Sequence, residues 1–89
     1  MVDYRKLVDN WYTGYMRHVT AGDNEYLSRE LEEEVDLLCN CLHVMWKRKQ
    51  ITKKEYQDTA GYCRGVWAKF EIHVQEIAKQ DQWEQLNLL

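Results

Sequence analysis

Apolar residues recur at helical spacing near the start of the chain. Within residues 3–19 they stand at offsets of 0, 3, 4, 7, 8, 11 and 15, which places them on one wide face of a helix. The pattern predicts an amphipathic helix over about residues 3–19. Its apolar face consists of Tyr4, Leu7, Val8, Trp11, Tyr12, Tyr15 and Val19.

Two later segments carry a narrower pattern. Over about residues 24–49 and 53–79, apolar positions alternate in steps of 4 and 3 residues, which is the seam of a helix packed lengthwise on another helix. Because the two seams match, we predict that these segments form an antiparallel helical hairpin. The seam residues are Leu31, Val35, Leu38, Leu42 and Met45, then Tyr56, Ala60, Cys63, Trp67, Phe70, Val74 and Ile77.

Local signals mark the helix ends. Gly22 predicts a turn after the first helix. The hydroxyl of Thr52 is placed to accept a hydrogen bond from the backbone N–H of Glu55, and the Glu55 side chain to accept one from Thr52, so the last long helix is expected to begin there. In the tail, residues 81–89, Asp81 offers a cap for a short fourth helix; the alternative is a frayed extension of the preceding helix.

Together these patterns predict an all-α fold in one domain, residues 1–89, with a long hairpin and a shorter N-terminal helix. Proline is absent and only four glycines occur, which favours uninterrupted helices. At 1.5 Å per residue the hairpin helices would each be about 40 Å long and the first helix only about 27 Å. One short helix cannot cover such a hairpin, so we predict a homodimer that buries the remaining apolar surface.

Small and aromatic residues extend the predicted interface. Gly61, Gly65 and Ala68 share a face away from the seam, which either the first helix or another molecule could cover. Aromatic residues make up 12% of the chain, more than one small core needs, and they are enriched at binding hot spots. At the margin of the first helix they either contact a partner or shield the core. The aromatic interface candidates are Tyr4, Trp11, Tyr12, Tyr15 and Trp83.

The hairpin tip is a second candidate site. The net charge of −3 gives no global attraction to nucleic acid or anionic lipid, but five positive residues gather at the tip beside two aromatic rings. Basic groups beside aromatics can hold a phosphate and stack a base, so the tip could bind an anionic ligand, a nucleotide, nucleic acid or an acidic protein. The alternative is a solvated turn. The tip residues are Trp46, Lys47, Arg48, Lys49, Lys53, Lys54 and Tyr56.

Metal and catalytic chemistry have little support. Cys39, Cys41 and His43 are zinc-ligand types, but 100° per residue turns Cys41 almost opposite the other two. We therefore expect no metal and no cofactor. Because no pattern places a nucleophile beside a base, we expect the protein not to be an enzyme. An odd number of cysteines within helical patterns, with no signal peptide or membrane-spanning run, predicts a reducing, cytoplasmic location and no membrane contact.

These observations favour a small interaction module. We expect an inhibitor or adaptor that binds another protein and modulates it. The compact, acidic chain is similar in composition to small accessory proteins of bacteriophages and other mobile elements, including inhibitors of host defence. The alternative is a binder of anionic ligands, nucleotides or nucleic acid through the basic tip.

Overall fold

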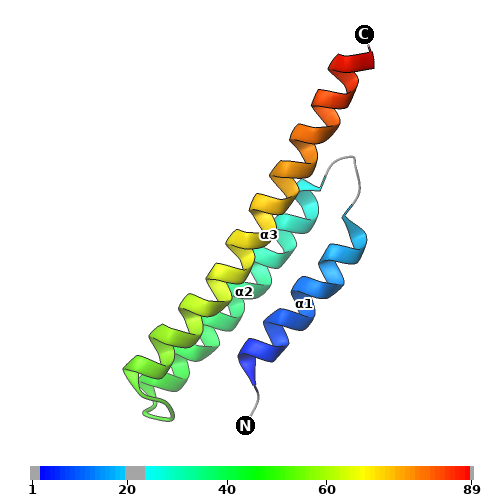
Figure 1. Ribbon diagram of the computed structural model, residues 1–89. Coiled ribbons are helices and arrows are strands. Elements are labelled where there is room, and N and C mark those ends of the chain that lie inside the picture. Colours follow the sequence, from blue (N-terminus) through cyan, green and yellow to red (C-terminus); the bar gives the residue numbers. More distant parts are fainter. Residues whose placement is uncertain (1–2, 20–23, 89) are drawn as a thin grey trace.

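The computed structural model describes the backbone of residues 3–19 and 24–88 and the side chains as far as residue 79. These residues form three helices and no strand: α1 (Tyr4–His18), α2 (Glu25–Lys47) and α3 (Lys53–Leu88). Helices α2 and α3 lie side by side as an antiparallel hairpin, and α1 runs along them in the direction of α3 (Figure 1). The predicted all-α hairpin is therefore confirmed. The turn predicted at Gly22 falls outside the described residues.

Helix α3 is longer than predicted. The end expected near residue 79 and the separate short helix in the tail are wrong, because α3 continues unbroken to Leu88. Of the two alternatives for the tail, the structure has the extension of the preceding helix. No glycine or proline stands between Lys79 and Leu88, so nothing in the sequence stops the helix there. As a result α3 extends well past the start of α2 (Figure 1).

The hairpin turn is closed by backbone hydrogen bonds at both of its ends. The N–H groups of Lys49 and Gln50 donate to the carbonyls of Trp46 and Met45 at 2.9 and 2.8 Å, which is a Schellman cap that ends α2. Lys49 takes the left-handed position of this cap, with a φ of 61°. At the start of α3 the predicted capping box is confirmed.

In that capping box the Glu55 N–H donates to Thr52 Oγ1 at 3.1 Å, and the Thr52 N–H donates to Glu55 Oε1 at 3.3 Å. Ile51, directly before the cap, is buried. The tip therefore has a defined conformation fixed by local sequence.

The core lies between the three helices. Val8 of α1, Leu31 of α2, and Cys63 and Phe70 of α3 are fully buried. Every predicted seam residue of the hairpin is buried or half-buried, which explains why the 4-3 pattern predicts the pairing. None of the described helices is long and apolar enough to cross a membrane.

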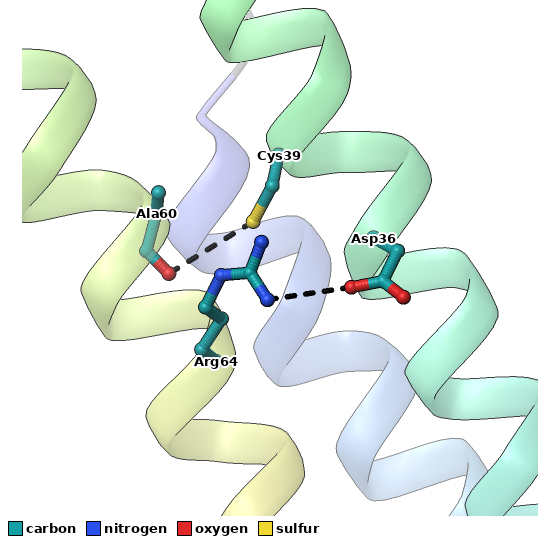
Figure 2. A network of polar contacts seen from close by, with 4 residues as sticks. All are labelled: Asp36, Cys39, Ala60 and Arg64. Atoms are coloured by element: carbon teal, nitrogen blue, oxygen red, sulfur yellow. Dashed lines mark hydrogen bonds and ion pairs between the residues drawn. The ribbon is translucent and has the colours of Figure 1, made fainter.

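Polar contacts also join α2 to α3, among them the Trp67 indole N–H, which donates to the Ser28 carbonyl at 3.0 Å. Figure 2 shows Arg64 Nη1 at 3.4 Å from Asp36 Oδ1, and Cys39 Sγ at 4.0 Å from the carbonyl oxygen of Ala60. The ion pair is more than half exposed, and exposed pairs contribute little to stability. The hairpin is therefore held mainly by its apolar seam.

Candidate functional site

The hairpin tip contains an ordered aromatic cluster. The rings of Trp46 and Tyr56 are stacked, with centroids 5.3 Å apart and planes 15° apart. His43 meets both rings edge-on, at 5.5 and 5.7 Å. The predicted pair of aromatics is thus brought together from α2 and α3, with His43, which the sequence analysis considered only as a metal ligand.

Basic side chains cover part of this cluster. Lys47 Nζ lies 4.2 Å from the centroid of the Trp46 ring, and Lys53 Nζ lies 5.9 Å from it. Arg48, Lys49 and Lys54 are exposed on the same turn. The predicted tip residues therefore gather at one end of the molecule, but the chain's own lysines and Tyr56 contact the Trp46 ring on which a base would stack.

The first turn of α3 is also partly occupied. A helix N-terminus attracts anions because its N–H groups point outward and the helix dipole is positive there. Here the Glu55 carboxylate accepts from the Thr52 N–H at this end. A bound phosphate would have to compete with that carboxylate, so an anion at the tip would depend mainly on the lysine and arginine side chains.

The aromatic residues of α1 mostly face the chain's own core. Tyr12 and Tyr15 meet Phe70 edge-on, at 6.1 and 6.0 Å, and the Tyr4 hydroxyl donates to Met45 Sδ at 3.5 Å. Trp11 is half-buried and packs against the core. These four predicted interface residues therefore have partners within the molecule, and only their outer edges are open to another one. The side chain of Trp83 lies outside the described residues.

Two tyrosine hydroxyls join α1 to the hairpin. Tyr15 donates to Glu34 Oε1 at 2.8 Å, and Tyr62 donates to both carboxylate oxygens of Asp9 at 2.7 and 2.9 Å. Burial, followed by the bond to Glu34, raises the pKa of Tyr15. The bond to Asp9 raises the pKa of Tyr62. Both phenols are therefore held in their neutral, donating form.

The small-residue face of α3 is open in the structure. Gly61, Gly65 and Ala68 are exposed, and a Cβ added to either glycine would meet no neighbouring atom within 4 Å. Helix α1 therefore does not pack closely on this face. A partner on it stays a prediction.

An apolar surface on α2 was missed by the sequence analysis. Leu37 and Val44 are 66% and 48% exposed, and Cys41 is exposed between them. We call these three residues the α2 stripe. Their offsets of 0, 4 and 7 place them on one face beside the hairpin seam, a spacing that could have revealed a second apolar row.

The α2 stripe borders a shallow hollow toward α1. Tyr4 and Met45 line it together with Cys41 and Val44. Both Tyr4 and Met45 are half-buried and contact each other, so the floor of the hollow is partly apolar. The stripe thus belongs to a surface shared by two helices.

The three cysteines occupy different environments. Cys39 and Cys63 are buried, and burial raises the pKa of both thiols, that of Cys63 to about 11. Cys41 faces solvent. In the part of the chain that the structure describes, no three His, Cys, Asp or Glu side chains converge on a place for a metal ion.

Comparison with known proteins gives no further guide to the site. No family model, curated protein or solved structure matches the chain.

Proposed function

We propose that this protein acts by binding another macromolecule through its helix surfaces, as an inhibitor or adaptor without catalysis of its own. The observation that supports the proposal is the α2 stripe. Single exposed apolar residues are common on protein surfaces and do not indicate a binding site. Three of them aligned along one helix face form the kind of row that contacts a partner helix or groove.

Covering the α2 stripe would release free energy. Leu37 is 66% exposed although it lies near the middle of α2. Burying a leucine or valine side chain stabilises a contact by about 1.5–3 kcal/mol. A partner that covers Leu37 and Val44 together would therefore gain affinity from surface that the chain leaves in water.

Site-specific photo-crosslinking tests this function. A benzoyl-phenylalanine placed at Leu37 is expected to give a discrete crosslinked product in cells that make the protein. The same group at Gln57, which is exposed on α3, is the matched control and is expected to give none. Adding Val44→Lys should remove the product at position 37. A folded protein that yields no product at position 37 would contradict the proposal.

The second candidate function is anion or nucleotide binding at the tip. The observation that favours it is the cluster of Trp46, Tyr56 and His43 with two lysines above the indole ring. It ranks below the first because the Trp46 ring is already covered and because Glu55 adds negative charge at the helix end.

Charge reversal at the tip tests the second function. Lys53→Glu combined with Lys54→Glu should abolish salt-sensitive binding of a labelled oligonucleotide, measured by anisotropy, with the helical circular dichroism unchanged. Arg17→Glu combined with Lys79→Glu changes the net charge equally at exposed positions away from the tip and should keep the binding. Equal binding by the two double variants would rule the tip out as the site.

A further inference from the structure

The charges of α2 are divided along its length. Its first half carries six acidic residues and one basic residue, Arg29, which pairs with Glu25, and basic residues occupy its end and the tip that follows. Two copies of such a helix attract each other only when they run antiparallel, because a parallel pair would place like charges side by side. The charged residues are Glu25, Arg29, Glu30, Glu32, Glu33, Glu34 and Asp36, then Lys47, Arg48 and Lys49.

The α2 stripe fits this antiparallel arrangement in one register. When Leu37 faces the partner's Val44, the same two-fold axis places Val44 against the partner's Leu37, and Arg48 falls opposite the partner's Glu33. Sliding one helix along the other by about one turn is unfavourable in either direction. One direction sets Val44 against the partner's Glu34, and the other sets Leu37 against the partner's Arg48. Each of these would bring a charge against an apolar side chain.

We propose that a second copy of this chain packs antiparallel on the α2 stripe, with Leu37 against the partner's Val44 and the two Cys41 side chains beside the two-fold axis. The inference rests on the proposed function, because it takes the α2 stripe as a binding surface and names its occupant. An isologous contact of this kind needs a surface that complements itself. The α2 stripe, with acidic residues on one side and basic residues on the other, is such a surface.

Cys41 provides the direct test. Purified protein treated with a short bismaleimide is expected to form a covalent dimer through Cys41, which is exposed. Cys39 and Cys63 are buried and their thiolates are disfavoured, so they should not react. Cys41→Ser should abolish the covalent dimer and keep the dimer mass measured by light scattering. A native protein that stays monomeric at its highest soluble concentration, and gives no crosslink, would overturn the inference.

Surface variants separate this interface from others. Leu37→Lys should convert the dimer to a monomer, because it places a charge in the apolar centre. Ile72→Lys is the matched control: Ile72 is 57% exposed on α3, away from the stripe, and the variant should remain dimeric. A dimer that survives Leu37→Lys would place the interface elsewhere and so refute the proposal.

A charge swap tests the orientation. Glu33→Arg and Arg48→Glu should each weaken the dimer severalfold at low salt, and the double variant should restore it, because the two positions face each other across the interface. Two weakened single variants without restoration would contradict the antiparallel register.

These results are distinguishable from failure of the proposed function. A monomeric protein that still crosslinks from position 37 to a different protein would refute the second copy but support an interaction function. A dimer whose product from position 37 contains only two copies of this chain would support the second copy and contradict the stripe as the site for a different partner. A monomer with no product from position 37 would refute both.

Discussion

Tyr15 donates a hydrogen bond to Glu34 at 2.8 Å while its ring packs edge-on against Phe70 at 6.0 Å. The hydroxyl and the ring can be tested separately. Tyr15→Phe should lower the free energy of unfolding by about 1 kcal/mol, because it removes only the hydrogen bond. Tyr15→Ala also removes the ring and should lower it by about 3 kcal/mol. Urea unfolding followed by tryptophan fluorescence measures both. Equal losses in the two variants would show that the ring contact contributes nothing.

Stability should fall in alkali as the buried thiol of Cys63 ionises. Burial raises the pKa of Cys63 from 9.0 to about 11, so the folded chain keeps this proton to higher pH than the unfolded chain does. The stabilisation is complete below pH 9 and is lost as the pH rises through about 11. At 1.36 kcal/mol per pKa unit, the loss is about 3 kcal/mol.

Single-cysteine variants test whether Cys63 causes this loss of stability in alkali. Cys63→Ala should be less stable than the native protein near neutral pH, because it leaves a cavity, but its stability should decline less between pH 9 and 11. Cys41→Ala, at an exposed position, should keep the native slope. The free energy of unfolding, measured at several pH values, tests this expectation. If the stability of Cys63→Ala fell with pH as steeply as that of the native protein, Cys63 would not be the cause.

Lys49→Gly should stabilise the protein. Lys49 holds a φ of 61°, a conformation that costs an L-residue roughly 1 kcal/mol and glycine nearly nothing. We expect a gain of about 1 kcal/mol, seen as a higher midpoint in thermal unfolding. Gln57→Gly, in the interior of α3, is the control and should lose about 1 kcal/mol. A loss in both variants would mean that the Lys49 side chain stabilises the turn by contacts of its own.

Gly65→Ala and Gly61→Ala should also stabilise the fold. Both glycines lie inside α3, and an added Cβ meets no atom within 4 Å. Alanine is favoured over glycine in a helix interior by about 1 kcal/mol. Thermal unfolding of the two variants measures the gain. A destabilised variant would reveal a close neighbour on this face, such as a second molecule.

The hairpin could be predicted because its information is local and periodic. The 4-3 spacing defines which residues of α2 and α3 meet, and Thr52 with Glu55 defines where α3 begins. The end of α3 was predicted wrongly because Asp81 has the character of a cap, while a helix ends only where something interrupts it. Asp81, with no glycine or proline nearby, is insufficient to end the helix.

The candidate surfaces were less accessible to sequence reasoning. Clustering at the tip follows from the hairpin, so Trp46, Tyr56 and the lysines were predicted together. The contact of Lys47 with the Trp46 ring depends on side-chain conformations that no spacing defines. Leu37 and Val44 were missed because their exposure depends on where α1 packs against α2. The spacing of residues within α2 does not define that position.

The position of α1 has a consequence for how the chain folds. Asp9 and Tyr62, which join α1 to α3, are 53 residues apart, whereas Cys39 and Ala60 of the hairpin are only 21 apart. Tyr15 and Glu34, which join α1 to α2, are only 19 apart. Closing the longer loop costs more chain entropy, so the contacts between α1 and α3 should form after those between neighbouring helices. During synthesis α1 leaves the ribosome before either of its neighbours. Its apolar face, with the fully buried Val8, must therefore wait for most of the chain to be made, and this interval is when a nascent-chain chaperone would have access to it.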